Sequence, residues 1–304
     1  MSKAARIREQ NVRQRIAAQQ AAAARTEQRR RAIIVGGALL AVIAVVAGLI
    51  VARSGAASPP AHAAQGGVHG TVLPASVARE ITAVPAATLA RIGAGSVPSY
   101  RNQTYAGPPL IKVSDTPLVR AGKPEMLYIG AEFCPYCAAM RWSMAVALSR
   151  FGTFTTPLRG LHSSPDDTDP NTPTLTFYGA RYSSKYLTFV PVENEDMNHQ
   201  PLQNTTASQQ ALWEKFDSTS SGVGYPFIDF GNQAVITAPL YDPVILKGMT
   251  WAQVAAALHD PSSRVGQAID GTANYMTAAI CHMTADSPAS VCSSPSLRAL
   301  GSGL

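Results

Sequence analysis

The longest uninterrupted hydrophobic stretch of this chain lies near its N-terminus, over residues 32–52. Its 21 residues include no charged or strongly polar side chain, and a helix of that length spans about 30 Å, which matches the core of a bilayer. Basic residues stand directly before it at 29–31 and after it at Arg53. The pattern therefore predicts a transmembrane helix whose N-terminal side is cytoplasmic and whose C-terminal side is extracytoplasmic. A cleaved signal peptide, ending near Ala61-His62-Ala63, is the alternative.

Farther along the chain, a short continuous apolar run is followed by hydrophobic positions that recur with the period of a helix. The apolar run over 125–133 predicts a buried strand, and residues 138–151 place their large apolar side chains on one helical face. That face consists of Met140, Met144, Ala147, Leu148 and Phe151. We also expect strands over 175–178, 186–192 (ended by Pro191 or the acidic residues beyond it), 225–230 and 234–238, and helices over 206–216, 250–258 and 263–283. Strands interleaved with helices indicate an α/β or α+β sheet with helices on its faces.

Charge changes this picture only at the N-terminus. The chain carries a net charge of +6, but residues 1–31 hold nine basic and two acidic residues, so residues 32–304 sum to −1. The basic character therefore belongs to a tail, which is typical of a segment beside anionic lipid, and no nucleic-acid partner is expected. The predicted organisation is a basic cytoplasmic tail over 1–31, the transmembrane helix, a flexible linker over 53–74 and an extracytoplasmic domain over 75–304.

The strongest chemical signal is the segment Ala131-Glu132-Phe133-Cys134-Pro135-Tyr136-Cys137, at the junction of the predicted strand and helix. A cysteine at a helix N-terminus meets unpaired N–H groups and the positive end of the helix dipole, which favour the thiolate. A second cysteine three positions later lies one turn away and can resolve a mixed disulfide. We therefore expect a redox pair with a lowered pKa at Cys134; a structural disulfide is the alternative. Pro135-Tyr136 carries no cation, so the motif gives no sign of an extreme oxidant.

The motif resembles the A-E-W-C-G-P-C site of the thioredoxin superfamily, and its inner dipeptide resembles that of glutaredoxins. Residues 223–232, Val-Gly-Tyr-Pro-Phe-Ile-Asp-Phe-Gly-Asn, resemble the later stretch of that superfamily in which a proline follows a cis peptide bond and faces the cysteines. The resemblance implies an α/β thioredoxin-like fold, with a central mixed sheet flanked by helices. It also implies Cys134 as nucleophile, Cys137 as resolving thiol, and a cis bond between Tyr225 and Pro226. The exposed backbone there would bind an extended substrate segment.

Over about residues 75–300 the chain also resembles the domain-of-unknown-function family 929 of single-pass membrane proteins, whose members carry a similar E-F-C-P-Y-C-A motif. This second resemblance implies a fold and a location but no activity.

Three features depart from the thioredoxin pattern. A buried acid of that superfamily stands six residues before the first cysteine, where this chain has Tyr128. Cys137 and Pro226 are 89 residues apart, which implies an insertion between the active-site helix and the proline-led hairpin, expected within 161–224. A long helical section follows the hairpin. The missing acid and the insertion favour a non-catalytic module as the alternative to an enzyme.

Two further candidates are less specific. We expect Cys281 and Cys292 to form a structural disulfide, because an oxidising compartment preserves such bonds, although four cysteines allow three pairings. Glu132 is a candidate for proton handling beside the pair, and a solvated carboxylate is the alternative. A zinc site formed by Cys134, Cys137, Cys281 and His282 is disfavoured, because the two halves are far apart in sequence and the second has no tight ligand spacing. We expect no metal and no cofactor.

Together these features predict a membrane-anchored extracytoplasmic thiol–disulfide oxidoreductase. Cys134 and Cys137 would be catalytic, and Tyr225 and Pro226 would bind substrate. The partners would be thiols or disulfides of secreted or membrane proteins, together with a redox partner that the sequence does not identify. The alternative is a non-catalytic thioredoxin-like binding or assembly module with structural disulfides. The direction of electron flow is left open.

Overall fold

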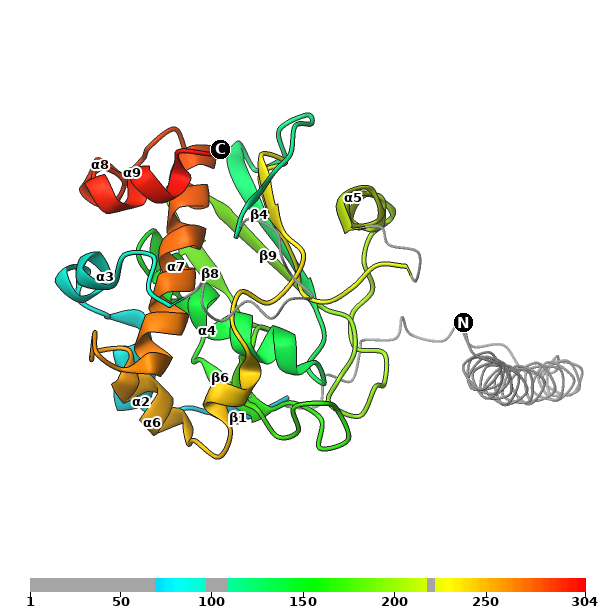
Figure 1. Ribbon diagram of the computed structural model, residues 1–304. Coiled ribbons are helices and arrows are strands. Elements are labelled where there is room, and N and C mark those ends of the chain that lie inside the picture. The colour runs from blue at the N-terminus through cyan, green and yellow to red at the C-terminus, as the bar shows by residue number, and fades with distance from the viewer. Residues whose placement is uncertain (1–68, 97–108, 218–221) are drawn as a thin grey trace, which may run out of the picture. The chain divides into compact units, whose positions relative to one another are not determined.

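A mixed β-sheet forms the centre of the part of the chain that the computed structural model describes, residues 69–96, 109–217 and 222–304 (Figure 1). Its six strands are β2 (Ile111–Lys112), β3 (Val119–Arg120), β4 (Lys123–Gly130), β9 (Thr188–Glu193), β10 (Phe227–Phe230) and β11 (Ala234–Ile236). They follow the order β2-β11-β10-β4, and both β3 and β9 pair with β4. β9 runs parallel to β4, and the other pairs are antiparallel.

Both faces of this sheet are buried, as alternate positions of β4 make clear. Met126 and Tyr128 belong to the larger hydrophobic cluster, whereas Leu127 and Ile129 belong to a smaller cluster on the other face. Successive side chains of a strand point to opposite faces, so a strand that is apolar at every position is covered on both sides. The continuous apolar run of the sequence has this physical cause.

Three helices cover the two faces. The larger cluster includes α4 (Pro135–Ser149) and α7 (Arg264–Met283), which pack against each other. The smaller cluster is covered by α5 (Ala207–Asp217), whose Trp213 is 4% exposed. Figure 1 shows α5 separated from α7 by the sheet. The predicted mixed α/β sheet flanked by helices is confirmed.

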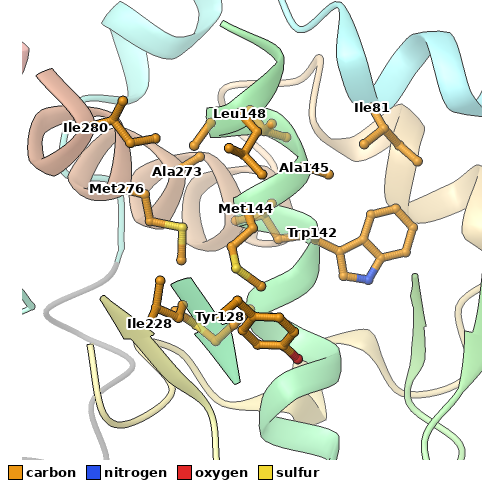
Figure 2. Packing of buried hydrophobic residues seen from close by; sticks show 14 of the residues in the cluster. Ile81, Tyr128, Trp142, Met144, Ala145, Leu148, Ile228, Ala273, Met276 and Ile280 are labelled. Atoms are coloured by element: carbon orange, nitrogen blue, oxygen red, sulfur yellow. The ribbon is translucent and has the colours of Figure 1, made fainter. Parts of the chain in front are cut away.

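Helix α4 is buried on all sides rather than on the single face that the sequence predicted. From Pro135 to Leu148 every residue except Tyr136 is buried, because the sheet, α7, α2 (Ala75–Thr82) and β7 (Pro173–Thr176) surround the helix. Figure 2 shows Met144 and Leu148 facing Met276 and Ala273 of α7, while Trp142 leaves the helix in another direction. The Trp142 indole N–H donates to the carbonyl of Pro173 at 2.9 Å, which satisfies its polar atom.

The remaining elements enlarge the domain around this core. Two additional sheets are formed by β1 (Thr71–Val72), β6 (Arg159–His162) and β7, and by β5 (Gly152–Phe154) with β8 (Tyr182–Ser184). The other helices are α3 (Ala86–Ile92), the 3₁₀ helix η3 (Pro243–Leu246), α6 (Trp251–Ala257), α8 (Ala289–Cys292) and α9 (Pro295–Gly301).

Two boundaries differ from the expected ones. Strand β1 lies inside the predicted linker 53–74, since Thr71 pairs with Gly160 of β6. Strand β9 begins at Thr188 rather than at residue 186, and it continues through Pro191 to Glu193, so the second of the two expected ends is the observed one. Among the described strands it pairs only with β4, and an edge strand tolerates a proline.

The predicted transmembrane span at 32–52 lies outside the described residues, as do the basic tail and residues 61–63. Among the helices of residues 69–96, 109–217 and 222–304, none combines the length and the apolar character needed to cross a bilayer.

Candidate active site

Cys134 stands at the N-terminus of α4, in the turn that follows β4. Its Sγ accepts a hydrogen bond from the backbone N–H of Cys137 at 3.3 Å, so the sulfur itself caps the helix. Pro135 occupies the first turn, where its missing N–H costs no hydrogen bond. Both cysteines carry free thiols. The predicted position of the Cys-x-x-Cys pair at a strand-to-helix junction is confirmed.

Aromatic side chains cover the two thiols. Cys134 is 4% exposed and Cys137 is fully buried. Phe133, Tyr136 and Tyr225 pack against the small cluster that contains both cysteines. Cys134 is therefore the thiol closer to solvent, and a substrate that reaches it must contact this aromatic cover.

Two loops fix the residues just before Cys134. The Ser164 N–H donates to the carbonyl of Phe133 at 2.9 Å, and the Glu132 N–H donates to the carbonyl of Glu195 at 2.8 Å. The ring of His199, in the loop after β9, lies 3.9 Å from that of Phe133 between centroids. Segments far apart in sequence thus hold the motif from both sides.

Tyr225 and Pro226 lie beside the cysteines because β10 pairs with β4. Phe227, the first residue of β10, stands opposite Ile129 near the end of β4, which brings the preceding residues to the Cys-x-x-Cys turn. The peptide bond between Tyr225 and Pro226 is cis, which confirms the expectation. The Tyr225 ring packs against Trp213 of α5 at 5.1 Å between centroids.

A buried ion pair lies beneath the cysteines. Arg141, one turn after Cys137 on α4, and Glu193, at the end of β9, both have side chains with 0% exposure. The guanidinium donates from Nε and Nη2 to the two carboxylate oxygens of Glu193 at 2.9 and 2.6 Å. Nη2 also donates to the carbonyl of Ala131 at 2.6 Å, and Glu193 accepts the backbone N–H of Phe177 at 3.2 Å. The arrangement holds a positive charge next to the Cys-x-x-Cys motif.

Our sequence interpretation missed this pair. Arg141 is a single charged residue in an apolar helix. It follows Cys137 by four residues, and this spacing puts both side chains on one helical face. That spacing was the available signal. Its partner was not identifiable, because the two residues are 52 positions apart.

Tyr128 occupies the strand position where the thioredoxin pattern has an acid. It is fully buried, and its ring lies over Gly130, whose missing side chain leaves the space that the phenol fills. The Arg141 guanidinium carbon lies 5.9 Å from the centroid of this ring. In Figure 2 the hydroxyl end of Tyr128 points away from Met144 and Ile228. Burial raises the pKa of Tyr128 well above its ordinary value, so the phenol remains protonated.

The two thiols differ in acidity. Burial raises the pKa of Cys134 well above its ordinary value, and the adjacent Cys137 raises it further. Burial also opposes ionisation of Cys137, but the hydrogen bond from the Cys134 thiol and the positive charge of Arg141 lower the pKa of Cys137. The expected lowered pKa at Cys134 is therefore corrected to Cys137. Burial opposes ionisation of both thiols, and the two differ because the hydrogen bond between them raises the pKa of Cys134 and lowers that of Cys137.

Glu132 is not the solvated carboxylate that we weighed as an alternative. It is 1% exposed; Thr176 donates to its Oε1 at 2.6 Å, and the Nδ1 of His69 lies 3.0 Å from its Oε2. Burial raises the pKa of Glu132. The side chain connects the motif to His69, whose own side chain is 21% exposed.

Cys281 and Cys292 form a disulfide with their Cα atoms 5.5 Å apart, as predicted. The bond joins the C-terminal end of α7 to α8. Nowhere in the described ranges do three or more His, Cys, Asp or Glu side chains gather in a way that would hold a metal ion.

The site is thus a reduced Cys-x-x-Cys pair at a helix start, set between a cis proline and a buried ion pair, in a mixed α/β domain. The chain belongs to the family described as a domain of unknown function, DUF929, whose model matches residues 109–282. No curated protein and no solved structure matches the chain.

Proposed function

We propose that this protein is a membrane-anchored, extracytoplasmic thiol–disulfide oxidoreductase with a thioredoxin-like domain. The observation that carries the proposal is the pair of free thiols at the start of α4, with the residue before a cis proline packed against them. A pair of this kind can accept or donate a disulfide through a mixed disulfide at one sulfur.

The order of elements supports the thioredoxin-like assignment. Strand β4, the Cys-x-x-Cys turn, helix α4 and then a proline-led hairpin of β10 and β11 follow one another as the resemblance implies. Between α4 and β10 lie β5 to β9 and α5, which is where an insertion was expected. Fold alone does not establish an activity, so the thiols carry the functional part of the proposal.

The roles of the two cysteines follow from their exposure. Cys134 is nearer to the surface, so it forms the mixed disulfide with substrate, and the deeper Cys137 is the resolving thiol. Tyr225 and Pro226 would bind the backbone of an extended substrate segment beside Cys134. The apolar segment 32–52 would anchor the domain, so the substrates would be secreted or membrane proteins.

The test is to equilibrate the purified full chain with glutathione buffers of different potential. Alkylation and mass spectrometry then report the state of the peptide that holds Cys134 and Cys137, separately from the peptides of the other pair. A reversible transition is expected; a midpoint near about −120 to −200 mV indicates oxidation or isomerisation, and one near about −270 mV indicates reduction.

Two variants make this test specific. Cys134→Ala is expected to abolish exchange, and Cys137→Ala is expected to accumulate a mixed disulfide at Cys134. The matched control is Cys281→Ser combined with Cys292→Ser, which should leave the midpoint unchanged. If the Cys134–Cys137 bond does not respond to glutathione, it is structural, and the chain is a non-catalytic binding module.

A further inference from the structure

Two buried donors beside Cys137 lack an acceptor. Among the described residues, neither the Tyr128 hydroxyl nor Nη1 of Arg141 has a hydrogen-bond partner of normal geometry. The other guanidinium donors are satisfied by Glu193 and Ala131. A buried donor without a partner is costly, so such groups favour a state of the site that supplies an acceptor.

A thiolate at Cys137 is the acceptor that this arrangement provides for. Cys137 lies one turn before Arg141 on α4, and the positive charge of Arg141 is among the influences that lower the pKa of Cys137. Burial and then the interaction with Cys137 raise the pKa of Tyr128, which keeps the phenol proton available as a donor. A guanidinium can donate but not accept, so it favours the anion over the neutral thiol or a disulfide sulfur, and the phenol O–H supplies a second donor to that anion.

We propose that Arg141, held in place by Glu193 and assisted by Tyr128, stabilises the Cys137 thiolate and thereby makes the Cys134–Cys137 disulfide a donor of disulfides to substrate thiols. This inference rests on the proposed function and adds the direction of electron flow. It also supplies the cation that the Pro135-Tyr136 dipeptide lacks. Arg141 acts through Cys137, so it is a positioning residue rather than a catalytic one.

The reaction balances without a further reactant. A substrate thiolate attacks Cys134 Sγ; a substrate–Cys134 bond forms, the Cys134–Cys137 bond breaks, and its electron pair leaves on Cys137. A second substrate thiolate then attacks the first substrate sulfur, and the electron pair of the broken bond leaves on Cys134, which takes up a proton. Two electrons pass from substrate to protein. Stabilising the first leaving thiolate speeds the first step and favours the reduced pair at equilibrium.

Several other ionisable groups surround Cys137 and influence the pH at which its thiol ionises. They are Tyr128 from β4, Arg141 and Cys134 from α4 and its cap, Glu193 from β9, Tyr225 before β10, and Glu132, which interacts with Arg141 and Glu193. Burial raises the pKa of Tyr225 to about 12, so it stays protonated at neutral pH. Glu193 opposes Arg141 in its effect on Cys137.

The experiment measures two quantities in the full chain. One is the glutathione equilibrium of the Cys134–Cys137 pair. The other is the pH midpoint of the Cys137 thiolate, followed by ultraviolet absorbance in a Cys134→Ser background. Arg141→Met combined with Glu193→Gln removes the cation without leaving an unpaired carboxylate. We expect this double variant to shift the thiolate midpoint upward by at least one pH unit and the equilibrium toward the disulfide by about tenfold.

Further variants separate charge from packing. Arg141→Lys keeps the positive charge and should retain most of the stabilisation of the thiolate. Tyr128→Phe should shift both quantities in the same direction as the double variant, but by less. Glu193→Gln alone should lower the pH midpoint of the thiolate. The matched control is Arg150→Met at the C-terminal end of α4, whose side chain donates to Asn274 and Thr277 and should leave both quantities unchanged.

The outcomes distinguish this inference from the proposed function. A wild-type midpoint at the oxidising end of the glutathione range, with the shifts above, supports the inference. A reversible pair that is reducing, or unaffected by the double variant, overturns it and leaves the oxidoreductase intact. Absence of any exchange in the wild type overturns the oxidoreductase itself, and with it the inference.

Discussion

Asp270 gives the most direct test of the energetics of this fold. It lies in α7 with 0% exposure, and among the described residues neither of its carboxyl oxygens has a hydrogen-bond partner. Burial raises the pKa of Asp270 to about 8. In the unfolded chain an aspartate titrates near about 3.9. Between these two values the folded state holds a proton that the unfolded state has released.

The sign and size of the pH dependence follow from this difference. The stabilising contribution is fully present below the unfolded pKa and is lost as pH rises toward the folded pKa, because only the folded state binds the proton. The free energy of unfolding falls by about 1.4 kcal/mol for each pH unit, which accumulates to about 4 kcal/mol between about pH 5 and pH 8. Asp270→Asn removes this titration while keeping the shape of the side chain.

The assay is urea unfolding of wild type and Asp270→Asn at several pH values from 5 to 8. We expect the free energy of unfolding of the variant, relative to that of the wild type, to increase by about 4 kcal/mol from pH 5 to pH 8. This increase does not depend on how the two proteins differ in stability at pH 5. The control is Asp260→Asn: this carboxylate is exposed, and its hydrogen bonds with Ser262 lower its pKa, so the slope should not change. A difference between wild type and Asp270→Asn that is constant over this range would refute the reasoning.

Three other variants test what stabilises the domain. Replacing both Cys281 and Cys292 by Ser should lower the free energy of unfolding by about 3 kcal/mol, because the disulfide closes a short loop. The urea midpoint of this variant should equal that of the reduced wild type, and unchanged stability would contradict the expectation. In Gly130→Ala the new Cβ would lie 2.0 Å from the Tyr128 hydroxyl oxygen. Urea unfolding should therefore show that the free energy of unfolding falls by about 1–3 kcal/mol. A smaller decrease would mean that the Tyr128 ring moves aside freely. Trp142→Phe removes the indole donor to the Pro173 carbonyl and should cost about 1–3 kcal/mol in the same assay, whereas a neutral result would mean that water replaces the bond.

Much of the fold near the motif was predictable, because its signals are local. The strand before Cys134, the helix after it and the hairpin with its turn at Gly231-Asn232 each depend on periodicity and turn residues within a short window. The pairing of Cys281 with Cys292 is also close in sequence. The cis bond before Pro226 came from the resemblance rather than from periodicity.

The surroundings of α4 were less predictable. A helix with one expected apolar face proved to be enclosed on every side, because strands and helices from distant segments pack around it. The period of the apolar positions indicates which face of a helix packs against a neighbouring element. It does not indicate how many elements pack around the helix in the folded chain.

The sequence by itself determined where the candidate site lies: two cysteines at a helix start, and a proline-led hairpin to face them. Only the tertiary structure decided the electrostatics of that site. It joined Arg141 to Glu193 across 52 positions, buried Glu132 against His69 and Thr176, and moved the lowered pKa from Cys134 to Cys137. The physical reason is that ionisation depends on burial and on charges within a few ångströms, and segments remote in sequence supply both.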